Sequence, residues 1–276
     1  MIAFFIKAAG AIVIAYIFVV GGLFVVQRPL LYHPGYVSST PEQAGLPQMS
    51  EGTVKTADGI LLRHWFAPPA DAGKPVGILF YGNAAYMEER AQEARSLLQL
   101  GYGVLLVSYR GYDGNTGSPT EQGLYADARA NVEWLKAQGY QDFFFMGQSL
   151  GSGVAAQMAF EYPSRALVLE TPYTSMVDAA SYHYPFVPVR WLLLDRYDSL
   201  SKISRIHAPV FVIQGEADEV IPVSQGRALF AAANEPKEAV WLPGAHHNDY
   251  YSYGGWPQLT AFLARYAGGS HENTQQ

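Results

Sequence analysis

The sequence predicts an α/β fold in which helices cover both faces of a mostly parallel β-sheet. Short apolar runs alternate along the chain with stretches of helical spacing, an arrangement typical of strands buried on both faces. Before this alternation, Asp58-Gly59 separates two β-like segments, which predicts an antiparallel hairpin of residues 53–56 and 60–66. The further expected strands are residues 76–81, 104–107, 143–146, 166–169, 210–214 and 239–242, and the expected helices are residues 88–100, 124–138 and 152–162.

The composition supports a large globular domain. The chain has 276 residues, of which 49% are hydrophobic and 15% charged, so it can build a sizeable core and is not disordered. Its net charge is −6 and no basic block is interleaved with aromatic residues, so nucleic acid is not an expected partner. The absence of cysteine excludes disulfides, thiolate catalysis and cysteine metal sites. The oligomeric state does not follow from these numbers.

The first part of the chain predicts a membrane anchor. Residues 8–26 carry no charge, and as a helix they would extend about 28 Å, close to the roughly 30 Å hydrocarbon core of a bilayer. Lys7 and Arg28 flank this run, where their charges can reach the membrane surface. One alternative is a cleavable signal peptide, for which the run is long and lacks a small-residue exit. The other is a buried core helix, against which the uniform apolarity over five turns argues.

The charges that flank the apolar run favour one orientation of this single-pass protein. The N-terminal side carries Lys7 and the α-amino group, whereas the other side carries only Arg28. Because positive charge favours the cytoplasmic side of a membrane, the globular domain is expected outside the cytoplasm.

The chain is expected to have four parts with a cap inside the largest one. The cap interrupts the alternation of strands and helices and is rich in aromatic residues, which suits a segment that covers a site. The parts are an anchor at residues 1–28, a Pro-rich linker at 29–50, a globular domain at 51–267 with its cap at about 173–205, and a flexible tail at 268–276.

A short motif follows the expected strand 143–146 and contains a candidate nucleophile. Gly147-Gln148-Ser149-Leu150-Gly151 is a G-x-S-x-G sequence between a strand and a helix, where a strained turn exposes a serine hydroxyl. Both flanking positions are glycine, as expected where side chains would collide. A tight turn capped by a serine is the structural alternative. An unassisted serine is a poor nucleophile, so a base and an acid are also required.

The acid and the base are expected in loops after later strands, because sites of open α/β sheets form beyond the carboxyl ends of strands. Asp218 follows the strand at 210–214, and His246 and His247 follow the strand at 239–242. Adjacent side chains diverge, so only one of the two histidines can be the base. Asp218 has a second interpretation as a turn or helix-cap residue, and two adjacent histidines alone make a poor metal site. The other histidines are expected to be surface or packing residues: His33, His64, His183, His207 and His271.

Two backbone N–H groups are expected to form an oxyanion hole. Leu150 directly follows the serine at the start of a helix, whose dipole favours negative charge there. Asn83 lies in the loop after the strand at 76–81, and Gly82 before it permits a close backbone approach. The alternative is that Asn83 is a simple turn residue.

Six stretches of the chain, taken together, are similar to one family. Over about residues 25–267 the sequence resembles the membrane-anchored α/β serine hydrolases, whose animal members include depalmitoylating thioesterases. This resemblance implies the α/β-hydrolase fold, with Ser149 as nucleophile and Asp218 as acid. It also implies that His247 is the base, because His247 precedes Asn248-Asp249. The matching stretches are residues 79–84, 109–130, 147–151, 169–176, 215–222 and 246–249.

The chain departs from this family at two positions. Tyr81 stands where the family usually has histidine before Gly-Asn, and Ser108 stands where it often has aspartate before Tyr-Arg-Gly. The first departure bears on the geometry of the oxyanion loop. The Gly-rich stretch 109–122 lacks the G-K-[ST] of a phosphate loop, so nucleotide binding is rejected.

The expected activity is hydrolysis of an acyl ester or thioester through an acyl-enzyme on Ser149, with no cofactor and no metal. The aromatic residues of the cap have two interpretations: they line a pocket for a lipid-like acyl chain, or they only pack the cap on the core. The same residues would also serve an acyltransferase or a peptidase, and a non-catalytic membrane-bound binding protein is a further alternative.

Overall fold

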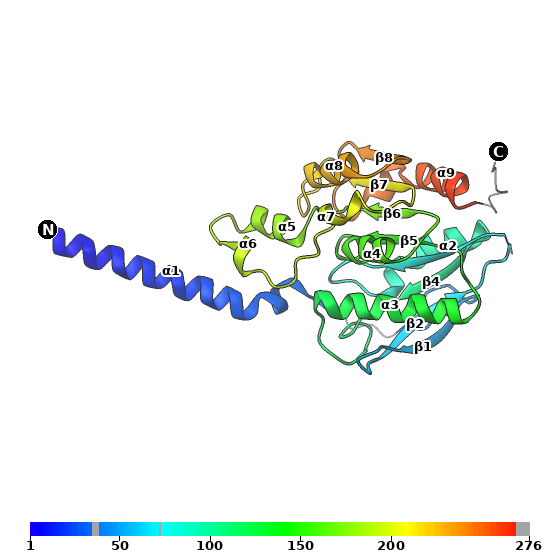
Figure 1. Cartoon of the computed structure of the whole chain (residues 1–276), viewed down its shortest axis with the longest axis horizontal. Coiled ribbons are helices and arrows are strands. Elements are labelled where there is room, and N and C mark those ends of the chain that lie inside the picture. The colour runs from blue at the N-terminus through cyan, green and yellow to red at the C-terminus, as the bar shows by residue number, and fades with distance from the viewer. Residues whose placement is uncertain (35–38, 72, 269–276) are drawn as a thin grey trace.

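The computed structural model describes residues 1–34, 39–71 and 73–268, and it confirms the predicted α/β fold with one eight-stranded sheet (Figure 1). The strands lie in the order β1-β2-β4-β3-β5-β6-β7-β8. The pairs β1–β2 and β2–β4 are antiparallel, and the other neighbouring pairs are parallel. The strands are β1 Ser50–Lys55, β2 Leu61–Ala67, β3 Val76–Phe80, β4 Gly103–Val107, β5 Phe143–Gln148, β6 Leu167–Glu170, β7 Val210–Gly215 and β8 Lys237–Leu242.

The central strands are buried on both faces, as their continuous apolar sequences predict. β3, β4, β6 and β7 are buried along their whole length, and β5 is buried except at Gln148. The predicted hairpin is also confirmed, since β1 and β2 pair from Lys55 and Leu61 outward across Asp58-Gly59. Gly59 has φ +91°, a left-handed conformation that glycine adopts without strain.

Helices cover both faces of the sheet. On one face a Cβ at Gly147 of β5 would meet α4, and a Cβ at Gly226 of α8 would meet Gln214 of β7. On the other face Phe211 of β7 packs on α9, and Phe144 of β5 packs on Tyr102, which follows α2. The helices named here are α2 Ala91–Gln99, α4 Leu150–Glu161, α8 Val223–Ala232 and α9 Trp256–Tyr266; α3 Glu121–Ala137 lies beside α4, and two 3-10 turns are η1 Met87–Arg90 and η2 Tyr250–Tyr253.

The N-terminal helix α1, Ile2–Leu31, is a candidate membrane span. It projects from the globular part of the molecule, and none of its residues is buried (Figure 1). Its most apolar stretch has a mean hydropathy of 2.6, which suits the interior of a bilayer. The helix extends beyond the expected span of residues 8–26 and includes Pro29. It ends at Leu31, and the chain becomes extended at Tyr32.

The stretch predicted as a linker, residues 29–50, is not extended throughout. It begins with the last turn of α1, and Leu46 and Met49 are buried in the core because they are apolar and follow a hydrogen-bonded turn. Residues 35–38 of this stretch, and the predicted tail apart from Gly268, lie outside the described residues.

The predicted cap segment forms three short helices, α5 Met176–His183, α6 Val189–Leu192 and α7 Leu200–Ile203, of which α7 packs on α4 and α8. Figure 1 shows α5 and α6 alongside the C-terminal half of α1. Polar contacts join the two elements. The Gln27 side chain bonds the backbone of Leu192 and Leu194, and Arg28 forms an ion pair with Asp195 at 2.9 Å. These polar contacts attach the cap to the end of α1.

Candidate active site

Ser149 lies at the predicted sharp turn between β5 and α4. Its φ of +49° and ψ of −116° belong to a strained conformation for a residue with a side chain. The glycines on either side are required by close packing. A Cβ at Gly147 would overlap the carbonyl group of Gly151, and a Cβ at Gly151 would overlap the carbonyl group of Phe80 on β3. Both flanking positions of this turn therefore require glycine.

His247 lies between Ser149 and Asp218 and contacts both. Its Nε2 is 3.0 Å from the Ser149 Oγ, and its Nδ1 is 2.9 and 3.0 Å from the two carboxylate oxygens of Asp218. The imidazole and the carboxylate are both buried. With the Nδ1 proton donated to Asp218, the Nε2 is free to accept the proton of the serine hydroxyl. Three residues that follow β5, β7 and β8 thus meet, with His247 placed between Ser149 and Asp218.

The carboxylate of Asp218 is held by groups that the sequence did not indicate. Its Oδ1 accepts hydrogen bonds from the backbone N–H of Val220 and Ile221 at 2.9 and 2.8 Å, and its Oδ2 accepts one from the Gln214 side chain at 3.2 Å. Asp218 is therefore a turn residue as well as the partner of His247. These bonds fix the position of the carboxylate.

His246 lies differently from its neighbour. Its side chain is exposed, and its Nδ1 is 2.9 Å from a carboxylate oxygen of Glu219. The hydrogen bond to Glu219 raises the pKa of His246. The two rings thus have different partners, and it is His247 whose ring contacts Ser149.

The loop after β3, which is predicted to supply one oxyanion donor and is called the oxyanion loop below, lies directly against the serine turn. A Cβ at Gly82 would be only 3.5 Å from the Ser149 Cβ, so the backbone of this loop approaches Ser149 closely. Asn83 follows Gly82, and Leu150 is the first residue of α4. Both predicted N–H donors therefore come from segments that border the Ser149 side chain, and the donor in α4 lies at the positive end of a helix dipole.

The side chain of Asn83 joins the oxyanion loop to the end of α1. Its Oδ1 accepts hydrogen bonds from the His33 backbone N–H and the Tyr112 hydroxyl, each at 2.9 Å. Its Nδ2 donates to the Leu31 carbonyl and lies 3.1 Å from the His33 Nδ1. His33 was expected to be a surface or packing residue, and nothing local to it in the sequence pointed to this contact 50 positions away.

The two departures from the family pattern meet at one carboxylate. The Tyr81 hydroxyl and the Ser108 hydroxyl both donate to Asp113 Oδ2, at 2.9 and 2.6 Å, and they lie 3.5 Å from each other. Burial raises the pKa of Asp113, and these two donors oppose that rise. Asp113 Oδ1 also accepts the backbone N–H of Met87, just beyond the oxyanion loop. Tyr81, which stands where the family usually has histidine, is thus part of a buried hydrogen-bond network around Asp113. This network contacts the chain just after the oxyanion loop.

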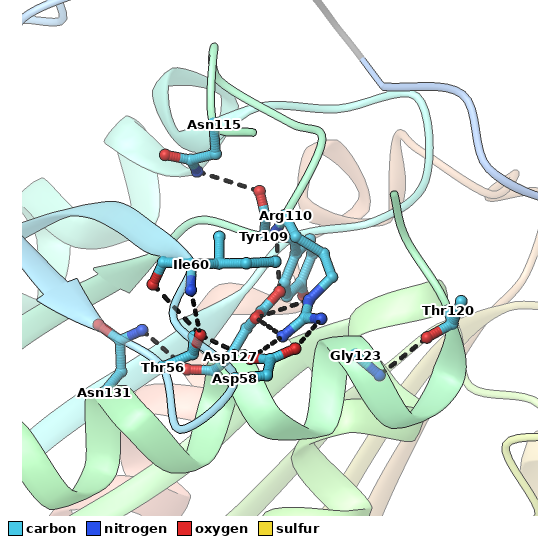
Figure 2. Close-up of polar contacts among 10 residues, drawn as sticks. All are labelled: Thr56, Asp58, Ile60, Tyr109, Arg110, Asn115, Thr120, Gly123, Asp127 and Asn131. Atoms are coloured by element: carbon cyan, nitrogen blue, oxygen red, sulfur yellow. Dashed lines mark hydrogen bonds and ion pairs between the residues drawn. The ribbon is translucent and has the colours of Figure 1, made fainter. Parts of the chain in front are cut away.

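The Gly-rich stretch is held by an ion-pair network (Figure 2). Arg110 donates to both Asp127, on α3, and Asp58, in the β1–β2 hairpin. The Arg110 backbone N–H donates to the other oxygen of Asp127 at 2.8 Å. Asn115 donates to the carbonyl of Tyr109 and so closes the loop. These contacts give the stretch a structural role.

A polar cavity lies beside the candidate site. It is lined by Gln148 and Asn248, which are neighbours of Ser149 and His247 in the chain, and by the acidic side chains of Glu89, Glu93 and Asp249. Burial raises the pKa of Glu89, and the nearby acidic groups raise it further. This side of the site therefore favours polar or cationic groups over anionic ones. Within the described part of the chain, no group of three or more His, Asp or Glu side chains is arranged to hold a metal ion.

Comparisons with known proteins agree with this fold. The family model of the α/β hydrolase fold matches residues 78–200. An uncharacterized protein of Mycobacterium tuberculosis is 44% identical over 227 residues, covering 81% of each chain. The α/β-hydrolase domain-containing protein 17B of Xenopus laevis is 30% identical over 217 residues, covering 76% of this chain and 74% of that protein. The solved structure of the Pyrococcus furiosus esterase Pf2001 has a TM-score of 0.70 at 20% identity, covering 86% of this chain and 99% of the esterase.

The fold and the site define an α/β protein with a serine, a histidine and a carboxylate gathered at the carboxyl edge of its sheet. The chain belongs to the α/β-hydrolase family. Membership of this family supports a hydrolase activity.

Proposed function

We propose that the protein is a membrane-anchored serine hydrolase that cleaves an acyl ester or thioester through Ser149, His247 and Asp218. The observation that carries this proposal is the position of His247, whose two ring nitrogens contact the serine hydroxyl and the aspartate carboxylate. The strained turn at Ser149 adds support, because such strain persists where the surrounding structure requires it and is common at active sites.

The chemistry follows from this arrangement. As the Ser149 Oγ bonds to the acyl carbon, its proton passes to the His247 Nε2, and Asp218 stabilises the imidazolium that forms. The carbonyl oxygen becomes an oxyanion, which the backbone N–H groups of Leu150 and Asn83 would bind. The bond to the leaving alcohol or thiol then breaks, and His247 returns the proton to it. A water molecule then gives a proton to His247 as its oxygen bonds to the acyl carbon. The bond between this carbon and the Ser149 Oγ breaks, the carboxylic acid leaves, and His247 returns the proton to Ser149.

Three variants test the residue roles. Ser149→Ala and His247→Ala should each abolish labelling by a fluorophosphonate probe and lower ester hydrolysis by about 10⁴-fold or more. His246→Ala is the matched control, because its side chain is exposed and contacts Glu219 instead of Ser149. Circular dichroism should show that all three variants are folded. Substantial hydrolysis by folded Ser149→Ala, or greater damage from His246→Ala than from His247→Ala, would refute the assignment.

We also propose that α1 anchors the protein once through the membrane, with the globular domain outside the cytoplasm. The flanking charges support this orientation, since Lys7 and the α-amino group lie on the N-terminal side of the span and Arg28 on the other. The protein should stay with the membrane in alkaline carbonate. Protease added to intact spheroplasts should digest the globular domain, and digestion only after lysis would show the opposite orientation.

A further inference from the structure

A buried carboxylate lies next to the turn that carries Ser149, and the proposed reaction does not use it. Glu170 is the last residue of β6, and it is fully buried. Its backbone carbonyl accepts a hydrogen bond from the Ser149 N–H at 2.9 Å, and it pairs with Gln148 in the register of β5 and β6. Glu170 therefore holds the nucleophile turn by its backbone, and its side chain remains for other contacts.

The side chain of Glu170 contacts two further segments that border the site. Its Oε2 accepts a hydrogen bond at 2.5 Å from Arg90, which ends η1 shortly after the oxyanion loop. Its Oε1 accepts a hydrogen bond from the hydroxyl of Tyr251 in η2, four residues after His247. One residue thus joins the serine turn, the chain after the oxyanion loop and the chain after His247.

Arg90 contacts the nucleophile turn as well. It is 1% exposed, and its Nη1 donates to the side chains of Gln148 and Glu93, each at 3.3 Å. A Cβ at Gly82 would lie 3.5 Å from the Ser149 Cβ and 3.9 Å from the Gln148 Oε1. The amide that Arg90 holds is therefore packed beside both the oxyanion loop and the nucleophile.

The chemistry of the Arg90–Glu170 pair favours a positioning role over a stabilising one. Taking two charges out of water offsets most of their attraction, so a buried ion pair contributes little net stability. Charge-assisted hydrogen bonds are nevertheless short and geometrically specific. Supporting contacts of this kind keep reacting groups within about 0.5 Å of their productive geometry. A misplacement of about 1 Å can lower a rate by about 100-fold.

We propose that Glu170 is a positioning residue that fixes Ser149 and His247 relative to each other, with Arg90 and Tyr251 as its partners. The proposal rests on the proposed serine hydrolase function. Glu170 acts through the Ser149 N–H on one side and through η2 on the other. When the contact with η2 is lost, the chain after His247 is held less firmly to β6. Proton transfer from the Ser149 Oγ to the His247 Nε2 then slows, while the binding of substrate changes little.

Tyr251→Phe is the mildest test, because it removes one hydroxyl and keeps the ring. In the full chain in detergent, it should lower kcat for a p-nitrophenyl ester by about tenfold and change KM by less than about twofold. Fluorophosphonate labelling of Ser149 should slow by the same factor. Tyr253→Phe is the matched control, since Tyr253 belongs to the same turn but is 48% exposed, and it should leave both rates unchanged. Circular dichroism verifies that both variants are folded.

Glu170→Gln tests the carboxylate itself. An amide presents its N–H₂ group to one of the two donors, Arg90 or Tyr251, so one contact is lost and kcat should fall by about 100-fold. Because Tyr251→Phe removes a bond to the same side chain, the double variant should lose less than the product of the two single losses. If Glu170→Gln does not fold, Tyr251→Phe and its control decide alone.

Several results would overturn the positioning role. They are an unchanged kcat in folded Tyr251→Phe, an effect on KM alone, an equal loss in Tyr253→Phe, and a double loss equal to the product of the single losses. Each of these leaves the hydrolase proposal intact, provided that Ser149 of the unchanged protein is labelled by the fluorophosphonate. If the unchanged protein is not labelled, the hydrolase proposal fails and the positioning role fails with it.

Discussion

Replacing Arg110 with methionine tests the role of the network in Figure 2, and we expect it to lower the free energy of unfolding by about 3–5 kcal/mol. The magnitude follows from burial. The Asp127 side chain is fully buried, and the guanidinium donates twice to its Oδ1, at 2.9 and 2.7 Å. Methionine keeps most of the side-chain volume but leaves this carboxylate without its counterion. The second partner, Asp58, is 52% exposed, so its pairing adds at most about 1 kcal/mol.

The assay is urea unfolding of the full chain in detergent, followed by tryptophan fluorescence. Asp58→Asn is the control and should stay within about 1 kcal/mol of the unchanged protein. Adding Asp127→Asn to Arg110→Met should recover part of the loss, because a neutral amide does not need a buried counterion. Fluorophosphonate labelling of Ser149 should persist in folded Arg110→Met, since this network does not touch the serine. An Arg110→Met loss below about 1 kcal/mol, or strictly additive losses in the double variant, would refute the reasoning.

Two further predictions concern His64 and Asn83. Burial lowers the pKa of His64 to about 4, below its unfolded value of about 6.5, so the unfolded chain binds the extra proton first. The free energy of unfolding should therefore fall by about 3 kcal/mol as the pH drops from above 6.5 to about 4. His64→Gln should remove this pH dependence, and identical urea midpoints against pH for both proteins would contradict it. Asn83→Ala removes the side-chain link to Leu31 and His33, and it should lower kcat by about 10- to 100-fold with little change in KM. A change in KM alone would show that Asn83 does not position the oxyanion loop.

The sequence alone determined the fold class, because apolar periodicity is a local property of the chain. Runs such as residues 143–146 could be recognised as buried strands without knowing which strands are their neighbours. The G-x-S-x-G turn is local as well. Its glycines are required by contacts within the turn and with the adjacent β3, so its residue types indicate its shape.

The sequence also indicated which loops bring the candidate catalytic residues together. Because the carboxyl ends of parallel strands meet at one edge of a sheet, Asp218 and His247 could be expected near Ser149 from their place after β7 and β8. The choice between His246 and His247 rested on resemblance to a family. The structure supplies a physical reason for it, since one ring contacts Glu219 and the other contacts Asp218 and Ser149.

Only the tertiary structure decided which distant side chains meet. Asn83 contacts His33 across 50 positions, and Tyr16 contacts Phe186 across 170. No periodic pattern encodes such pairs, because they depend on how loops cross at the edge of the sheet and on the angle at which α1 leaves it. The cap shows the same limit. Its aromatic residues look alike in sequence, yet Tyr173 and Tyr197 are buried while Phe186 is exposed. The reason is that Tyr173 contacts Leu150 and Tyr197 contacts Tyr125 in the globular domain, whereas Phe186 lies beside Tyr16 of α1.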